Sequence, residues 1–266
     1  MPALAARLAD VKVSASAAMT ARARDLRAQG IAVISLSNGE PDSPTPRHAI
    51  EAAYKAALLG DTKYPPQGGT VALKQAIQRK FRRDNALDYA LDEIIVGNGG
   101  KQVIFNAFMA TVDPGDEVVI PTPHWISYAD MAKVAGGVPV SVPCPQNNGF
   151  KPRPEDIDAA ITPRTKWVLL NFPGNPTGAV PSRAEIKALA DVIMRHPHVW
   201  VMTDDMYEHL LYDGFEYSTI AAVEPGLKDR TLTVNGVSKT YSMTGWRIGF
   251  GGGPANLIRG LFNMQG

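Results

Sequence analysis

The sequence has little of what disulfide-rich, secreted or membrane proteins contain. Cys144 is the single cysteine among 266 residues, which excludes an internal disulfide and favours a reducing compartment such as the cytoplasm. No apolar run reaches the roughly 18 residues of a membrane-spanning helix, so no membrane segment is predicted. The first 13 residues carry charges at Arg7, Asp10 and Lys12 and lack the apolar stretch of a secretory signal.

Neither sign of charge predominates. The chain has 27 basic and 26 acidic residues and a formal net charge of +1, which indicates no polyanionic partner. Arg22, Arg24 and Arg27 fall on one expected helix, where a solvated face is a simpler interpretation than nucleic-acid binding. Hydrophobic residues make up 45% of the chain, which is enough for a large core. We therefore expect a globular protein without a nucleic-acid partner.

Short apolar runs alternate with amphipathic stretches along the chain. Strands are expected near residues 31–36, 93–96, 117–120, 138–142, 166–170, 199–203, 231–234 and 248–251. Helices are expected near residues 16–29, 46–59, 71–83, 100–112, 127–135, 154–160, 182–195 and 254–264. This alternation predicts an α/β domain on a mostly parallel sheet, in which ligands bind beyond the carboxyl ends of the strands.

Lys239 follows the expected strand at 231–234 and lies among small residues, and Arg247 comes eight positions later. Poor solvation and a nearby cation both lower the pKa of an amine and make it a better nucleophile. An arginine presents a planar fork of donors that suits phosphate. The pair therefore suggests a Schiff-base lysine beside a phosphate site, which pyridoxal phosphate (PLP) requires.

Residues 97–102, Gly-Asn-Gly-Gly-Lys-Gln, join an expected strand to an expected helix. Glycines let backbone N–H groups approach an anion, and a helix N-terminus adds partial positive charge. The spacing is neither that of a Walker loop nor that of a full dinucleotide fingerprint. Taken alone, the segment is more typical of a plain strand-to-helix turn than of an anion site.

Polar and aromatic side chains follow three other expected strands. Asn175, held out of the helical region by the next proline, sits in a rigid turn after 166–170, although a plain turn is an equal alternative. Asp204 ends the strand at 199–203, where a buried carboxylate needs a partner such as a protonated pyridine nitrogen, unless it caps a helix. Tyr207 can reach the same side if a helical turn follows.

Trp125 follows the expected strand at 117–120 and could stack on a flat ring, although such a tryptophan is more often a packing residue. His124 beside it could be a base, but a lone histidine is more often structural. Each of these structural alternatives is reasonable alone. They fail together, because all five groups follow separate strands of one predicted sheet.

The chain resembles the class I aminotransferases of PLP fold type I, and in particular the bacterial aspartate and aspartate/prephenate aminotransferases. The matching segments are Asn38-Gly39-Glu40-Pro41-Asp42, Thr62-Lys63-Tyr64, Gly99-Gly100-Lys101-Gln102, Asp113-Pro114-Gly115-Asp116-Glu117, Asn175-Pro176-Thr177-Gly178, Asp204 with Tyr207, and Gly236 through Gly249 around Lys239. They run in order along essentially the whole chain.

The resemblance implies a cofactor, PLP, and a catalytic role for Lys239, Asp204 and Tyr207. Lys239 would carry PLP as an aldimine and move a proton between the substrate α-carbon and the cofactor. Asp204 would keep the pyridine nitrogen protonated, Tyr207 and Asn175 would hydrogen-bond the phenolic oxygen, and Trp125 would stack on the ring. The reaction implied is ping-pong transfer of an amino group between an L-amino acid of the aspartate or glutamate type, or an aromatic one or prephenate, and a 2-oxo acid.

The resemblance also implies the phosphate and substrate contacts. The phosphate would meet Gly99, Gly100, Lys101, Ser238 and Arg247. Ser238 would compensate for Gly236, which stands where some branches of the family have a phosphate-binding serine. Tyr64 would reach the phosphate of a neighbouring subunit, which implies a homodimer with shared sites. The residues implied in substrate binding are Gly39, Trp125, Asn175, Ser14 and Ser16. No metal site is expected.

The fold implied is a three-layer α/β/α large domain with a mostly parallel seven-stranded sheet. Residues 1–45 would form an N-terminal arm and the start of a small-domain segment, and residues 46–266 the PLP-binding large domain. Family members continue past this point with a small C-terminal domain that carries a carboxylate-binding arginine, so we expect that domain to be missing here. Alternatives are a PLP-dependent carbon–sulfur β-lyase, a non-catalytic PLP-binding regulator, which the lack of an N-terminal extension disfavours, and an inactive truncated protein.

Overall fold

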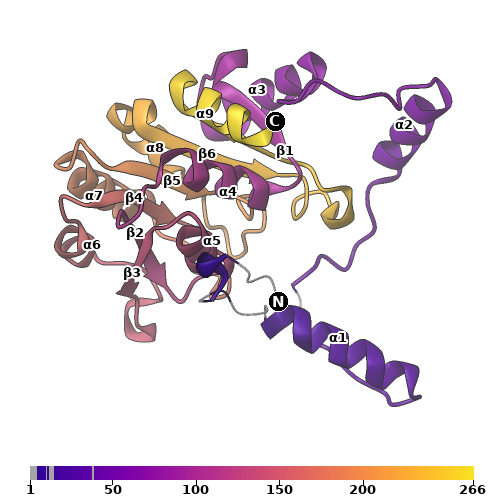
Figure 1. Cartoon of the computed structure of the whole chain (residues 1–266), viewed down its shortest axis with the longest axis horizontal. Coiled ribbons are helices and arrows are strands. Elements are labelled where there is room, and N and C mark those ends of the chain that lie inside the picture. Colours follow the sequence, from indigo (N-terminus) through magenta and orange to yellow (C-terminus); the bar gives the residue numbers. More distant parts are fainter. Residues whose placement is uncertain (1–4, 10, 12–14, 38) are drawn as a thin grey trace.

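A central sheet organises the computed structural model of this chain, which describes all residues except 1–4, 10, 12–14 and 38 (Figure 1). The strands, in their order across the sheet, are β1 (Ile94–Gly97), β7 (Gly249–Gly252), β6 (Thr231–Gly236), β5 (Trp200–Asp204), β4 (Thr165–Leu170), β2 (Glu117–Thr122) and β3 (Val138–Pro143). Strand β7 is antiparallel to both of its neighbours, and the other pairs are parallel. The prediction of a mostly parallel seven-stranded sheet is confirmed.

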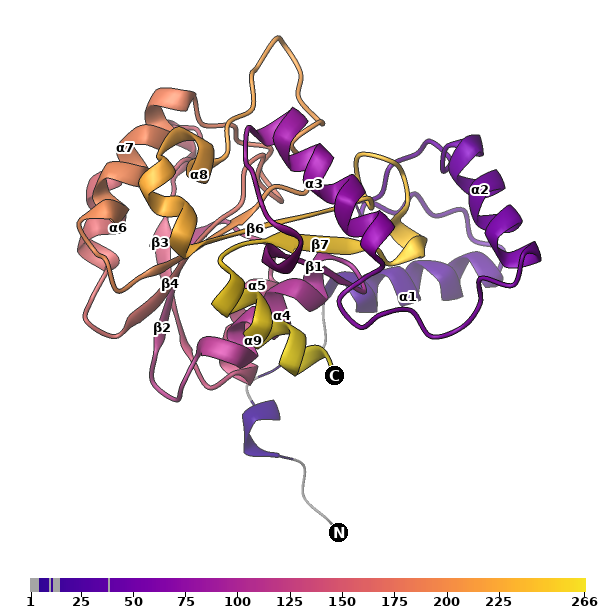
Figure 2. The same cartoon turned by 90° about the horizontal axis from the view of Figure 1, so that it is seen from above.

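Helices cover both faces of the sheet, so the body has the predicted three layers (Figure 2). One face packs against α4 (Gly100–Thr111), α5 (Ser127–Val134) and α9 (Ala255–Gln265). The other packs against α3 (Val71–Asn85), α6 (Pro154–Ala160), α7 (Arg183–Met194) and α8 (Ile220–Val223). Strands β2, β4, β5 and β6 are buried along most of their length because helices cover both of their faces, whereas the edge strand β3 is largely exposed.

Two helix starts form as the sequence predicts. The hydroxyl of Thr70 accepts a hydrogen bond from the backbone N–H of Leu73 at the start of α3. Ser182 and Glu185 form a reciprocal capping box at the start of α7, which satisfies two backbone donors that the helix leaves free. Within the described residues, no helix is both long and apolar enough to cross a membrane.

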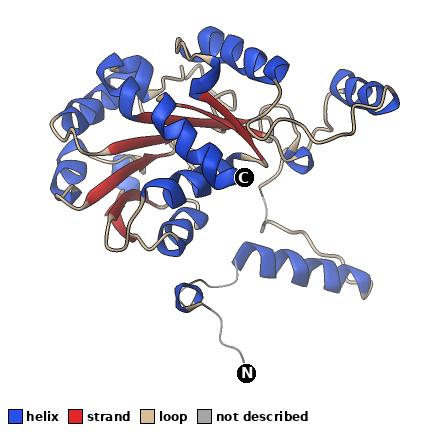
Figure 3. Ribbon diagram, turned by 45° about the horizontal axis from the view of Figure 1, so that its top comes forward, coloured by secondary structure: helices blue, strands red, loops and turns tan. Residues whose placement is uncertain are grey.

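The N-terminal segments lie outside the layered body. Helices α1 (Ala15–Ala28) and α2 (Arg47–Leu58) project away from it (Figures 1 and 3), and α2 buries none of its residues. The strand predicted at residues 31–36 is wrong: the segment is an extended loop, with Ile34 91% and Leu36 93% exposed. Its apolar alternation has no neighbouring strand to pair with, so it stays outside the sheet. The domain boundary at residue 45 stays a prediction.

Candidate active site

The candidate site lies at the carboxyl ends of the parallel strands, where the chain leaves β4, β5 and β6. Asp204 is the last residue of β5, and Asn175 and Lys239 lie in the segments that follow β4 and β6. The N-terminus of α4 adjoins the same edge, since a Cβ atom on Gly100 would come 3.4 Å from Val234 of β6. Residues distant in sequence are thereby brought together.

Asp204 is buried at the centre of this edge. Its Oδ2 accepts a 2.6 Å hydrogen bond from the hydroxyl of Tyr128 on α5, and its Oδ1 accepts one of 3.3 Å from the backbone N–H of Met206. Burial raises the pKa of the Asp204 carboxyl, and these two hydrogen bonds oppose that rise. A cation placed beside this carboxylate would offset the cost of burying it.

Tyr207 lies between an amide and an amine. The amide Nδ2 of Asn175 is 3.5 Å from the Tyr207 hydroxyl, and the ammonium of Lys239 lies 5.8 Å from the centre of the tyrosine ring. Asn171 fixes this arrangement, because its Oδ1 accepts from the backbone N–H of Asn175 at 2.9 Å and its Nδ2 donates to the carbonyl of Asp204 at 2.8 Å.

Lys239 is half-buried, and burial lowers the pKa of its amine, while the negative charge of Glu40 partly opposes that decrease. The Lys239 ammonium donates a 2.5 Å hydrogen bond to the carbonyl of Gly39. The segment around Gly39 is tied to the loop after Lys239 by a further bond, from the hydroxyl of Thr45 to the carbonyl of Ser242 at 2.8 Å. The lysine is thus enclosed between its own loop and the N-terminal segment.

The start of α4 and Arg247 form a site suited to an anion. Gly99 caps the helix with φ at 85°, and a Cβ atom there would lie 2.2 Å from Nη2 of Arg247. The guanidinium therefore lies directly over the helix N-terminus. The first backbone N–H groups of α4, at Gly100 and Lys101, have no acceptor inside the helix. Ser238 is buried near the end of β6. Helix dipole, free N–H groups and guanidinium favour phosphate together.

An aromatic pair adjoins these groups. Trp125 is partly buried and meets Tyr128 edge to face at 5.2 Å between ring centres, and the Lys101 ammonium lies 4.9 Å from the Trp125 ring centre. His124 Nδ1 lies 2.8 Å from the carbonyl of Trp125, which is a local structural bond.

Other predicted residues lie at the periphery or outside the described part. Tyr64 is fully exposed in the loop after α2, and Ser16 is exposed at the start of α1. Ser14 falls outside the described residues. Tyr128 and Asn171 were not predicted as site residues. Asn171 directly follows β4, and that position was a signal that could have identified it. No feature of the sequence near Tyr128 indicated its role.

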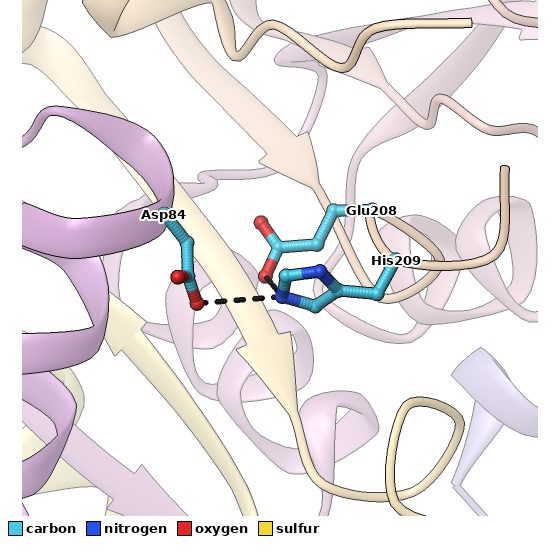
Figure 4. A group of neighbouring side chains, drawn as sticks. All are labelled: Asp84, Glu208 and His209. Atoms are coloured by element: carbon cyan, nitrogen blue, oxygen red, sulfur yellow. Dashed lines mark ion pairs between the residues drawn. The ribbon is translucent and has the colours of Figure 1, made fainter. Parts of the chain in front are cut away.

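A second polar group lies beside the turn that follows Asp204. Asp84 of α3, Glu208 and His209 approach one another closely enough to hold a metal ion (Figure 4). However, Lys80 pairs with Glu208, and Arg83 pairs with Asp84 at 2.6 Å, so both carboxylates already have cationic partners. We therefore assign this group as an ion-pair network.

Comparison with known proteins decides the family. A model of the family "Aminotransferase class I and II" matches residues 31–266. The chain belongs to this family. It is 53% identical over 261 residues to the aspartate aminotransferase of Rhizobium meliloti (strain 1021) and 55% identical over 258 residues to the aspartate/prephenate aminotransferase of Cereibacter sphaeroides. These matches cover 98% and 97% of this chain but 64% of each relative, so the chain spans less than two thirds of their length.

Solved aminotransferase structures have the same fold. The crystal structure of the Rhizobium meliloti aspartate aminotransferase superimposes with a TM-score of 0.96 at 52% identity, over 100% of this chain and 66% of that one. The Thermus thermophilus enzyme with maleate gives a TM-score of 0.95 at 44% identity, over 100% and 68%. The predicted family and fold are confirmed.

Proposed function

We propose that this aminotransferase chain forms a PLP site and that the protein transfers an amino group between an L-amino acid and a 2-oxo acid in a ping-pong reaction. One observation carries the proposal. A buried carboxylate, a lysine of lowered pKa and an anion site at a helix N-terminus meet at one edge of the sheet. These are the three partners that the pyridine nitrogen, aldehyde and phosphate of PLP need.

The residues present fit this cofactor. Asp204 is a buried acid whose oxygens are held by neutral donors, so a protonated ring nitrogen would supply the missing opposite charge. Because Gly99 has no side chain, the Arg247 guanidinium can lie against the start of α4. A phosphate bound there would contact both the guanidinium and the backbone N–H groups of the first helical turn. When bound, PLP supplies an electron sink for the electrons of the substrate's α-carbon.

Each residue of the chain then has a defined task. Lys239 would take the proton from the substrate α-carbon, which its lowered pKa favours because the uncharged amine is the basic form. Tyr207 and Asn175 would hold the phenolic oxygen, and Trp125 would cover the ring face. Ser238, together with the first turn of α4, would complete the phosphate site.

For the substrate we propose dicarboxylic amino acids, with aromatic ones or prephenate as further candidates. The support is the similarity to an aspartate aminotransferase and an aspartate/prephenate aminotransferase. Gly39 and Asn175 would approach the substrate carboxylate. Ser14 and Ser16 belong to an arm that would close over the substrate.

We also propose a homodimer in which Tyr64 reaches the partner's phosphate. The support is the exposure of Tyr64 together with apolar side chains on the projecting N-terminal segments, which a second copy would cover: Ile34, Leu36, Leu58 and Leu59. A cytoplasmic location stays a proposal that rests on the single cysteine.

Product analysis tests the reaction. PLP-loaded protein incubated with aspartate and 2-oxoglutarate should yield oxaloacetate and glutamate, and the Lys239→Ala variant should yield neither. Lys228→Ala, at a half-buried lysine that pairs with Glu93 outside the site, should behave as the parent. A carbon–sulfur β-lyase would instead release a thiol, pyruvate and ammonia from a cystathionine-type substrate. Those products without glutamate formation would overturn the proposal.

A further inference from the structure

The turn that carries Tyr207 is anchored to a helix outside the active site. Glu208 directly follows Tyr207, yet its side chain is only 1% exposed and points away toward α3. There it pairs with the Lys80 ammonium and accepts a 2.6 Å hydrogen bond from Asn85 Nδ2. Lys80 also donates to Asn85 Oδ1 at 2.6 Å, so the three side chains form a closed ring of bonds.

This turn contacts the candidate site in several places. Its backbone closes through Glu208 N–H to the carbonyl of Asp205 at 3.1 Å. The Met206 N–H donates to Asp204, and the Met206 methyl group packs where Cβ atoms on Gly100 and Gly236 would fall, at 2.9 and 3.0 Å. The turn thus contacts Asp204, the start of α4 and the end of β6.

We propose that Glu208 is a positioning residue, which through α3 fixes the turn that carries Tyr207. The inference rests on the proposed function, because it concerns the same site. A carboxylate this buried, with a cation and an amide on its two oxygens, is expensive to leave unpaired. The turn therefore has one favoured position, and the Tyr207 hydroxyl is held 3.5 Å from Asn175. His209 and Asp84 extend the network toward solvent, with 3.3 Å between His209 Nε2 and each neighbouring carboxylate oxygen.

The first test is independent of PLP. Hydrogen exchange of backbone amides is measured in the 266-residue protein and in the Glu208→Gln and Asn85→Ala variants, with Asp88→Asn as control. Asp88 forms an exposed ion pair with Arg82 of α3. We expect exchange at residues 205–210 to accelerate about tenfold, the factor that about 1.4 kcal/mol gives, while strand β6 stays protected. Asn85→Ala leaves the Glu208 charge paired with Lys80, so it carries the test if Glu208→Gln does not fold.

The second test reads the position of Tyr207 spectroscopically. Donors to the phenolic oxygen of bound PLP stabilise its anionic form, so a misplaced Tyr207 should raise the pH midpoint of the cofactor's absorbance change. We expect this rise in Glu208→Gln and Asn85→Ala and no change in Asp88→Asn. Exchange at 205–210 equal to that of the control, or an unchanged midpoint, would overturn the inference. A parent protein that binds no PLP would instead contradict the proposed function, and the exchange result would still decide the role of Glu208.

Discussion

The hydroxyl of Tyr128 on α5 donates a 2.6 Å hydrogen bond to Oδ2 of Asp204 at the end of β5. Both groups are buried, and the burial that raises the pKa of Asp204 also raises that of Tyr128 well above its ordinary value. Tyr128 therefore stays a neutral donor, and Asp204 is the more acidic member of the pair. This bond is the chain's own support for the carboxylate that would face the ring nitrogen.

Removing that donor should weaken cofactor binding. In Tyr128→Phe, Asp204 loses the hydrogen bond that lowers its pKa, so the carboxylate is more readily protonated and its hold on a ring cation is weaker. We expect the Kd for PLP to rise about tenfold, equivalent to about 1.4 kcal/mol. Titration of cofactor absorbance measures this. Tyr212→Phe, at an exposed tyrosine, is the control, and equal Kd values in the two variants would contradict the role given to Tyr128.

Gly99→Ala should disrupt the phosphate end of the site. The new methyl group would fall on the Arg247 guanidinium, and the residue would be strained at a φ of 85°. We expect the Kd for PLP to rise by about tenfold or more. Gly115→Ala is the control for backbone strain without a steric clash, because Gly115 has a φ of 91° but open space around it. If both variants bind PLP as tightly as the parent, Arg247 does not serve the phosphate.

Glu40 should tune the basicity of Lys239. Its negative charge raises the pKa of the Lys239 amine against the larger, opposite effect of burial. In Glu40→Gln this support is lost while the acceptor for the Thr244 hydroxyl remains, so the pKa falls further and the uncharged amine predominates at lower pH. The pH midpoint for the reaction of Lys239 with PLP should shift downward. Asp42→Asn in the same segment should leave it in place, and an upward shift in Glu40→Gln would be inconsistent with this electrostatic role.

Asp205 should make folding stability depend on pH. Burial and the nearby Glu208 charge raise the pKa of Asp205 from 3.8 to about 7. Between these values the folded state holds a proton that the unfolded state has lost, so the free energy of unfolding falls as pH rises, by at most about 1.4 kcal/mol per pH unit. Asp205→Asn removes this dependence.

Urea denaturation of parent and variant between about pH 4 and pH 7 measures the difference. The amide introduced by Asp205→Asn cannot titrate, so the stability of this variant relative to the parent should increase steadily across the interval. Parallel curves would show that Asp205 is already ionised in the folded protein.

The sequence predicted the groups that lie at strand ends and missed those that depend on which strands are neighbours. Asp204 and Lys239 could be found because each follows an apolar run that can only be a buried strand. Tyr128 could not, because its contact with Asp204 spans 76 positions and requires α5 to pack beneath β5. In the sequence, Glu208 is indistinguishable from an exposed charged residue, because its burial depends on the packing of α3 against the turn. Residues 31–36 have the apolar pattern of a strand, but this pattern does not show whether a neighbouring strand is present to pair with them.

The most direct measurement concerns Lys239 itself. The protein is incubated with PLP, reduced with borohydride and digested, and the peptides that carry the cofactor are identified by mass spectrometry. We predict a modification at Lys239 and its loss in Lys239→Ala, while Lys101 stays unmodified. Cofactor attached to another lysine, or none retained by a protein whose fold is intact, would contradict the assignment of Lys239 as the residue that binds PLP.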